Sequence, residues 1–295
     1  MSTPTTTLRR LQAITGAAVL AFALSACGGD DGGSVEVESD ASFPAGTTMA
    51  KLNEAGKITI GTKFDQPGIG AKKPGADAPE GLDPEMGKII AAKLGIEEDG
   101  IKWVETVSDN REPFLGNGTV DIVIASYSIT DERRAVVGQA GPYYVTGQQL
   151  LVAKDDDSIK GPDDLDGKKV CSVEGSTSIK TVEEEYGAAP VPFATYSECV
   201  QQLLSGSVDA VTTDGAILLG YAAENPDELK VVGDAFSEER YGVGFKNGDT
   251  EMCEFLNETI EGAFEDGSWQ DAFDATLGEA GVEAPEPPTV DPCEA

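Results

Sequence analysis

The chain contains no histidine among its 295 residues. This absence excludes Ser-His-Asp and Cys-His nucleophilic catalysis, and it excludes zinc centres built on imidazole ligands. It also removes the side chain that most often carries protons near neutral pH. Carboxylate or lysine chemistry remains open, but the absence favours a protein that is not an enzyme. Neither a cofactor nor a metal is expected.

Basic residues are also scarce, with 21 Lys and Arg against 53 Asp and Glu and a formal net charge of −32. Such a surface repels phosphate backbones and anionic lipid headgroups. Nucleic acid is therefore an unsuitable partner, and contact with a membrane would need an anchor other than electrostatic attraction. The hydrophobic fraction of 40% is ordinary for a globular protein.

Long apolar runs are missing except at the N-terminus, where residues 11–26 are apolar apart from three polar residues and follow Arg9 and Arg10. The run is too short and interrupted to span a membrane, and its plan is that of a cleavable export signal. It ends in the lipobox Leu24–Cys27. We therefore expect residues 1–26 to be removed and Cys27 to be acylated, which attaches a protein without inserting it. The arginine pair does not decide the export route.

Residues 27–50 are acidic and rich in small residues, so they cannot bury enough apolar surface to fold alone. We expect a flexible tether there. The predicted location is the outer face of the cytoplasmic membrane, with the protein monomeric. The sequence is compatible with either envelope type, although a lipid anchor favours a cell with a single membrane.

Apart from Cys27, four cysteines remain, an even number that suits an oxidising exterior. Three pairings are possible. We favour Cys171–Cys199 and Cys253–Cys293, because each pair lies within one chain segment. The first pair would stabilise the fold by roughly 3–4 kcal/mol in the chain-entropy description. No pair has the close spacing of metal ligands.

From Lys57 onward, short β-branched runs alternate with helical stretches, which predicts an α/β fold. A helix is expected to begin at Asp83 as N-cap, followed by Pro84, and to end at Gly95. Further helices are expected over 197–204, 215–223 and 252–277, the last interrupted near Gly267. The predicted strands are 58–60, 101–107, 120–125, 169–173, 208–212 and 229–232.

A series of short motifs follows along the chain: Ile58–Lys63, Gly118–Ile122, Ser126–Arg133, Gly141–Tyr143, Leu165–Val170, Glu174–Ser178, Gly206–Ala210 and Thr213–Asp214. In their order and spacing these motifs together resemble the polar amino-acid substrate-binding proteins of ABC importers. The resemblance covers about residues 57 to 277, and Lys63–Pro67 with Asp109–Arg111 looks most like the glutamate-binding branch.

The resemblance implies a two-lobe, periplasmic-binding-protein-like fold of type II, with a hinge of two crossing segments. Closure of the hinge around a ligand is the expected motion. Polar or glycine-containing stretches at 153–161 and 239–245 could form the crossings. The expected divisions are lobe 1 over 51–153 and 244–285, lobe 2 over 154–243, and a C-terminal tail over 286–295.

The resemblance also assigns ligand-binding roles. Arg133 would hold the α-carboxylate through two parallel hydrogen bonds, on a short helix capped by Thr130. Ser126 and Ser128 match family positions that receive the ammonium and carboxylate groups. Asp214, just past a strand, matches the acid that binds the α-ammonium.

In the second half, Ser176, Thr177 and Ser178 open a predicted helix whose free amides would form an anion site, although these residues could equally be N-caps. By resemblance, Lys63 and Arg111 face the distal group of the ligand. Burying two cations without an anion would be costly, so glutamate is favoured, then aspartate. Glutamine remains possible if Lys63 turns outward.

These expectations describe a lipid-anchored substrate-binding component that captures glutamate and delivers it to an ABC permease. The chain has no P-loop, so ATP hydrolysis would belong to separate ATPase subunits. A binding protein for glutamine or another polar amino acid is one alternative. A lyase on the same scaffold is another, with Asp214 and Glu174 as the candidate acids, and an extracellular sensor is a third.

Overall fold

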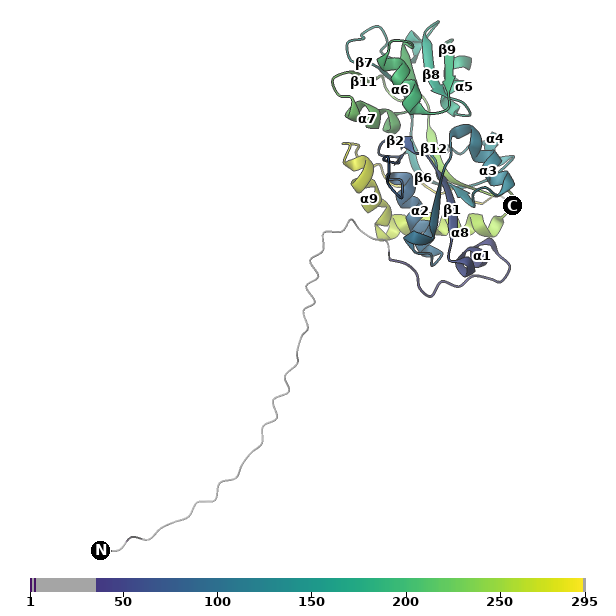
Figure 1. Cartoon of the computed structure of the whole chain (residues 1–295), viewed down its shortest axis with the longest axis vertical. Helices are drawn as coiled ribbons and strands as arrows, with labels where there is room; N and C mark the ends of the chain where they lie inside the picture. The colour runs from purple at the N-terminus through teal and green to yellow at the C-terminus, as the bar shows by residue number, and fades with distance from the viewer. Residues whose placement is uncertain (2, 4–35, 294–295) are drawn as a thin grey trace. The chain divides into compact units, whose positions relative to one another are not determined.

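The computed structural model describes residues 1, 3 and 36–293 (Figure 1). The predicted export signal apart from residues 1 and 3, the predicted acylation site Cys27 and the predicted tether as far as residue 35 lie outside the described residues. Among the helices that the structure describes, none is long and apolar enough to cross a membrane. The body consists of two α/β lobes, each built on a five-stranded sheet, as expected for the two-lobe fold.

The sheet of lobe 1 mixes parallel and antiparallel pairs. Its order is β4 (Ile101–Glu105), β1 (Ile58–Thr62), β5 (Ile122–Val123), β12 (Glu239–Phe245) and β6 (Gly138–Thr146). A small hairpin of β2 (Asp65–Gln66) and β3 (Gly70–Ala71) follows β1. The helices of this lobe are α1 (Thr48–Ala55), α2 (Leu82–Lys93), α3 (Arg111–Asn117), α4 (Asp131–Arg134), α8 (Thr250–Asp266) and α9 (Ser268–Phe273).

Lobe 2 contains the remaining sheet. Its order is β11 (Leu229–Val232), β7 (Gln148–Ala153), β10 (Ala210–Asp214), β8 (Lys169–Val173) and β9 (Ala189–Phe193). Its helices are α5 (Thr177–Glu184), α6 (Tyr196–Leu204) and α7 (Gly215–Glu224). Short 3₁₀ turns occupy Glu98–Gly100, Ser108–Asn110 and Pro162–Asp164, and one π-helical turn follows α9 over Asp274–Gly278.

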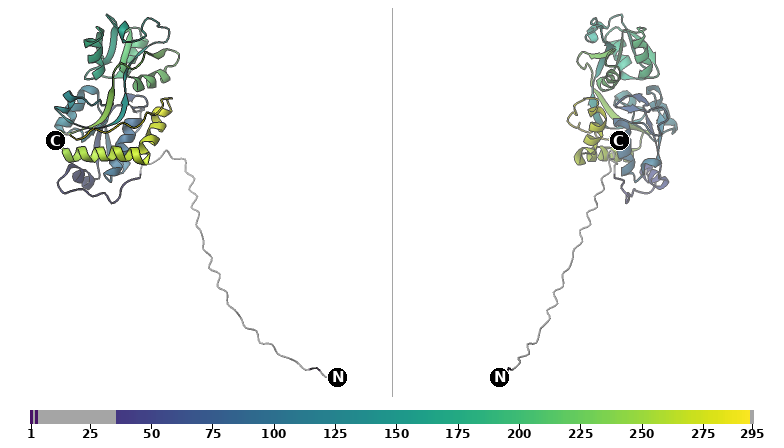
Figure 2. Two further views of the ribbon diagram at one scale, coloured as in Figure 1. Left: turned by 180° about the vertical axis from the view of Figure 1, so that it is seen from behind. Right: turned by 60° about the vertical axis from the view of Figure 1, so that its left-hand side comes forward.

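One apolar cluster extends through both lobes, from Ile60 and Met86 in lobe 1 to Val211 and Leu218 in lobe 2, and each lobe has a smaller cluster of its own. Helix α2 packs its apolar face, including Met86 and Ile90, into lobe 1, where both residues are fully buried. In Figures 1 and 2, α8 runs across lobe 1 on the side away from lobe 2. The interruption predicted near Gly267 is confirmed, because this residue ends α8 with a left-handed backbone at φ 88°.

All six predicted strands overlap observed ones, but four strands of the main sheets were not predicted. Strands β6 and β12 are buried along most of their length, so they lack the alternation of apolar and polar residues that marks a half-buried strand. They also contain glycines that look like turn signals. Strand β9 contains Pro190 and Pro192, which fit there because it lies at the edge of its sheet.

The predicted crossings at 153–161 and 239–245 are wrong. Strand β7 pairs with β10 and β11 of lobe 2, and β12 pairs with β5 and β6 of lobe 1. The chain therefore crosses at Gly147, between β6 and β7, and again over 233–238. The two crossings touch, since the Gln148 amide donates to Ser237 Oγ at 3.1 Å. A crossing as short as one residue leaves no stretch of polar composition to mark it.

The predicted tether is too long at its C-terminal end. The Glu38 amide donates to Ala92 O at 3.0 Å, the Phe43 ring packs edge-on against Phe255 at 5.6 Å, and α1 begins after the N-cap Thr47. Residues 38–50 therefore belong to lobe 1. Their few apolar side chains cannot form a core of their own, but they dock on a core that the rest of the lobe supplies.

The two disulfides join Cys171 to Cys199 and Cys253 to Cys293, which is the pairing that the sequence favours. The first ties α6 to β8, and the second ties the C-terminal tail to α8. The described part of the tail, as far as residue 293, has no helix or strand, but Asp291 in it accepts from Arg134 Nη2 at 2.8 Å and Arg240 Nη2 at 2.5 Å. It is therefore held against lobe 1.

Candidate functional site

Side chains from both lobes meet at a small cavity of about 10 Å³, which offers room for about one water molecule in this conformation. Eight of the nine predicted binding residues line this cavity, all except Lys63. Ser108, Tyr196 and Thr213, which the sequence did not indicate, complete the wall. The cavity is too small for an amino acid, so a ligand of that size can enter only if the lobes separate.

Arg133 lies on α4, where Thr130 caps the helix by accepting from the Arg133 amide at 3.2 Å, as predicted. Its guanidinium is almost fully buried. Nη1 donates to Ser128 O at 2.7 Å, and Nη2 reaches lobe 2, where it donates to Gly175 O at 3.0 Å. The nearest carboxylate oxygen is Oε1 of Glu112, 3.4 Å from Nε. The guanidinium is thus positioned mainly by main-chain carbonyls.

Arg111, the first residue of α3, is held in a similar way. Its Nε donates to Ser108 O at 3.0 Å, Nη1 to Ala125 O and Ser126 O at 3.3 and 3.2 Å, and Nη2 to Gly175 O at 3.1 Å. Burial lowers the pKa of this guanidinium to about 10, so it remains charged at neutral pH. Within the described part of the chain, it has no carboxylate in ion-pair contact.

Tyr127 compensates the charges of the two guanidinium groups, a role that no pattern in the sequence indicates. Its ring centroid lies 4.4 Å from the guanidinium carbon of Arg111 and 5.0 Å from that of Arg133. The electron-rich face of a tyrosine attracts such cations. Its hydroxyl donates to Glu112 Oε1 at 2.8 Å, which fixes the ring. An aromatic ring offsets the charges only in part, so the cavity wall keeps an excess of positive charge.

Lys63 follows β1 and is buried, but it lies behind the cavity wall. Its Nζ donates to Ser108 Oγ at 2.8 Å, and Ser108 lines the cavity. Burial, together with the charge of Arg111, lowers the pKa of Lys63 to about 7. The structure therefore places this cation one side chain further from the cavity than the sequence predicts.

Asp214 faces the arginines from lobe 2, at the end of β10. Its Oδ2 accepts from Tyr241 Oη at 2.5 Å, whereas Oδ1 is buried and has no hydrogen-bond partner in the described structure. Burial, and next the charge of Glu239, raise the pKa of Asp214 to about 7. A buried carboxylate oxygen without a donor suits a ligand that brings its own N–H groups.

The start of α5 supplies the other wall from lobe 2. Ser176 is its N-cap and accepts from the Ile179 amide at 3.1 Å, so the capping alternative holds for this residue. Thr177 donates from Oγ1 to Glu239 Oε2 at 3.0 Å, and Ser178 is buried in the first turn. All three line the cavity at the positive end of the helix dipole.

The prediction that Asp83 caps α2 is wrong. The N-cap of α2 is Gly81, and Asp83 is the second residue of the helix. Asp83 is fully buried. It accepts from the Ser126 amide at 2.7 Å and from Tyr143 Oη at 2.5 Å. In the sequence, an acid before a proline predicts an N-cap. Only the hydrogen-bond partners of Asp83, which come from β6 and from the segment after β5, show that it has another role.

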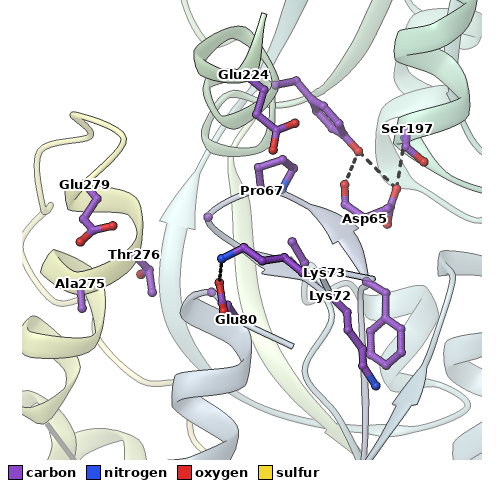
Figure 3. A pocket seen from close by; sticks show the side chains of 15 residues that line it. Asp65, Pro67, Lys72, Lys73, Glu80, Ser197, Glu224, Ala275, Thr276 and Glu279 are labelled. Carbon is purple, nitrogen blue, oxygen red and sulfur yellow. Dashed lines mark hydrogen bonds and ion pairs between the residues drawn. The ribbon is translucent and has the colours of Figure 1, made fainter. Parts of the chain in front are cut away.

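A larger groove of about 460 Å³ lies beside the β2–β3 hairpin and contains none of the nine predicted binding residues (Figure 3). Its charged side chains are largely exposed or paired, as Lys73 is with Glu80 at 2.7 Å. Asp65 on its wall accepts from the amides of Tyr196 and Ser197 at 2.8 and 3.2 Å, which joins the lobes. We assign ligand binding to the smaller cavity, because its charged groups are buried and incompletely paired.

Two α/β lobes joined by two crossings, with buried charges of both lobes facing one cavity, define a two-lobed solute-binding protein. The sequence profile of the bacterial extracellular solute-binding proteins, family 3, matches residues 58–279, and the chain belongs to this family.

The names of relatives within the family refer to different amino acids. The glutamate-binding protein GluB of Corynebacterium efficiens is 39% identical over 92% of this chain and 91% of its own length. The ABC transporter glutamine-binding protein GlnH of Bacillus subtilis is 35% identical over 77% of this chain and 83% of its own. The structure of an ancestral arginine-binding protein bound to glutamine matches with a TM-score of 0.71 at 37% identity, over 76% of this chain and 98% of that one.

Proposed function

We propose that this protein is the substrate-binding component of an ABC importer for glutamate. One observation carries the proposal: two buried guanidinium groups of lobe 1 and an unpartnered carboxylate oxygen of lobe 2 line the same cavity. A zwitterion with a second carboxylate matches this arrangement of charges. The similarity to proteins named for glutamate binding supports the same ligand.

Each charged group then has a role. Arg133 and the Ser128 hydroxyl bind the α-carboxylate, and Ser126 with Asp214 Oδ1 binds the α-ammonium. The amides and hydroxyls of Ser176, Thr177 and Ser178 complete the wall from lobe 2. Gly175 O now accepts from both arginines, so separation of the lobes frees these donors for a ligand.

Arg111 binds the distal carboxylate, and Lys63 adds positive charge from behind Ser108. The positive charge of Lys63 favours a ligand with an anionic side chain, glutamate first and aspartate next. Because Lys63 reaches the cavity only through the Ser108 hydroxyl, glutamine is also a candidate ligand. A ligand with a neutral side chain would lose less binding free energy at this cavity than at a cavity lined by the Lys63 ammonium group itself.

The anchoring part of the proposal rests on the sequence. Acylation of Cys27 would hold the protein, as a monomer, on the outer face of the cytoplasmic membrane. There it would deliver its ligand to a permease with separate ATPase subunits, and it would perform no chemistry itself.

Calorimetric titration of the chain lacking residues 1–27 tests the ligand. The protein is stripped of carried-over ligand and titrated with glutamate, aspartate, glutamine and arginine. We expect one-to-one binding of glutamate with a free energy near −8 kcal/mol or stronger, as a micromolar or tighter dissociation constant requires. Stronger binding of arginine than of glutamate would overturn the assignment of the charges.

A further inference from the structure

Ser126 has a backbone conformation that its residue type disfavours. Its φ is 44°, and it is the sole residue other than glycine with a positive φ in the part of the chain that the structure describes. In the left-handed region the Cβ of an L-residue crowds the following carbonyl, so such residues persist only where surrounding contacts hold them. Ser126 lines the cavity, so this conformation lies at the binding site itself.

Two contacts hold the main chain of Ser126. Its amide donates to Asp83 Oδ2 at 2.7 Å, and its carbonyl accepts from Arg111 Nη1 at 3.2 Å. Both are assisted by charge, and the first is the shorter, which makes it the stronger of the two. The conformation of Ser126 and the position of Arg111 are therefore linked through one residue.

The surroundings of Asp83 suit an ionised carboxylate despite its complete burial. It lies in the first turn of α2, where the helix dipole favours negative charge. Its second oxygen accepts from Tyr143 Oη at 2.5 Å. Burial raises the pKa of Asp83 to about 6, because the hydrogen bonds from Tyr143 and Ser126 and the charges of Lys63 and Arg111 offset only part of the desolvation, so the carboxylate remains mostly ionised at neutral pH. A buried acid with these partners is fixed in position, and so is the amide that donates to it.

We propose that Asp83 is a positioning residue that holds Ser126 in its left-handed conformation and thereby sets the geometry of the ligand-binding wall. Asp83 itself does not line the cavity. It acts through the Ser126 amide, and the Ser126 carbonyl passes the constraint to the Arg111 guanidinium. The effect on ligand affinity rests on the proposed function, whereas the effect on Ser126 does not.

A double-mutant cycle separates this role from general support of the fold. Ser126→Gly removes the cost of the left-handed conformation, whereas Ser126→Ala removes the same hydroxyl and keeps that cost. We expect Asp83→Ala to weaken glutamate binding about tenfold in the Ser126→Ala background. In the Ser126→Gly background we expect the loss to be about threefold or less, because glycine adopts the conformation unaided.

Two further variants exclude simpler roles. Asp83→Asn keeps an acceptor for the Ser126 amide and removes the charge, so we expect it to lose about threefold or less in affinity. Tyr143→Phe removes the other hydrogen bond of Asp83. We expect it to change the affinity for glutamate by the same factor in both Ser126 backgrounds. If Asp83→Asn lost as much as Asp83→Ala, Asp83 would be a counterion to the nearby cations, and the proposal would fail.

The same cycle is measured by urea unfolding, with the midpoint as the readout. If the wild-type protein bound none of the amino acids tested, the proposed function would fail, but unequal effects of Asp83→Ala on the midpoint in the two backgrounds would still support the inference. Equal effects in both backgrounds, in affinity and in midpoint, would overturn it.

Discussion

At the scale of the residue, main-chain carbonyls from three segments fix the two guanidinium groups of the cavity. Arg111 and Arg133 share the acceptor Gly175 O, which belongs to the other lobe. The carbonyls of lobe 1 hold each group even when the lobes separate, so neither group can follow a smaller or shifted ligand without giving up its bonds within that lobe. This rigidity makes them suitable for selecting a ligand by the spacing of its carboxylates.

Arg133→Ala should therefore reduce the affinity for every amino acid by about 100-fold or more, as expected when one partner of a buried charge pair is removed. Arg134→Ala is a matched control, since the neighbouring guanidinium pairs with Asp291 on the outside of lobe 1. Calorimetric titration of both variants with glutamate and glutamine measures the difference. Micromolar binding that survived in Arg133→Ala would contradict the assigned role.

Arg111→Ala should separate the two candidate ligands. Glutamate loses a charged partner for its distal carboxylate, whereas glutamine loses only a neutral hydrogen bond, so we expect a loss about tenfold larger for glutamate. Competition between the two ligands measures the ratio directly. Equal losses would show that Arg111 does not contact the side chain of the ligand.

Two groups near the cavity titrate around neutrality and act in opposite directions on glutamate binding. Asp214, with its pKa raised to about 7, must be ionised to hold an ammonium, so affinity should fall as the pH drops below about 7. Lys63, with its pKa lowered to about 7, must be protonated to favour an anion, so affinity should fall as the pH rises above about 7.

The affinity for glutamate should thus be highest near neutral pH, with proton release on binding at acidic pH and proton uptake at alkaline pH. Titrations in buffers of different ionisation heat measure both. Glutamine should show only the acidic decline, and Lys63→Met should abolish the alkaline decline for glutamate. If the affinity for glutamate still fell at alkaline pH in Lys63→Met, a group other than Lys63 would cause the decline.

At the scale of the element, α6 connects the site to lobe closure. Its N-terminal residue Tyr196 lines the cavity, and the Tyr196 and Ser197 amides donate to Asp65 of lobe 1. The Tyr221 hydroxyl on α7 also donates to the Asp65 carbonyl. The Cys171–Cys199 disulfide fastens α6 to β8, so the helix moves with its sheet. The Asp65 carboxylate therefore accepts from the first amides of α6 only when the lobes are together.

Asp65→Ala should weaken glutamate and glutamine equally, by about 3- to 10-fold, because it removes a contact of the closed form rather than a contact with the ligand. Stopped-flow measurements should assign the loss to faster dissociation. Glu80→Ala removes a carboxylate from the same groove that pairs only within lobe 1, and it serves as the control. A loss confined to one ligand would show that Asp65 acts on the binding pocket itself.

At the scale of the whole molecule, the two crossings lie against each other with no spare volume. A Cβ at Gly147 would lie 2.4 Å from Ser237 O and 2.7 Å from the Ala235 Cβ of the other crossing. Gly147→Ala should therefore push the crossings apart, lower the melting temperature by several degrees and weaken binding of every ligand.

Gly161→Ala is the matched control for this change, since a Cβ there would meet nothing within 4 Å. Calorimetric melting with and without glutamate measures both variants. A melting temperature of Gly147→Ala equal to that of the wild type would show that the crossings can yield, and the junction would then be more compliant than the contacts indicate.

Part of the site could be predicted from the sequence because local signals mark it. Arg133 lies in a capped helical turn, Asp214 ends a strand and Lys63 follows one, at the edge where α/β sheets gather ligands. Tyr127, Asp83 and the Gly175 carbonyl could not be found in this way. Their roles depend on contacts across as many as 64 residues of chain, which no local pattern encodes.

The sequence by itself determined the α/β class and, through its motifs, the two-lobe fold and most of the residues that face the cavity, because periodicity and motif order are local properties. It favoured the observed disulfide pairing without excluding the other two. Only the tertiary structure decided where the lobes divide, which oxygen of Asp214 lacks a partner, and how far Lys63 lies from the cavity. These depend on strand pairing and burial between distant segments. The same holds for the constraint on Ser126, since the carboxylate that holds it comes from a helix 43 residues earlier in the chain.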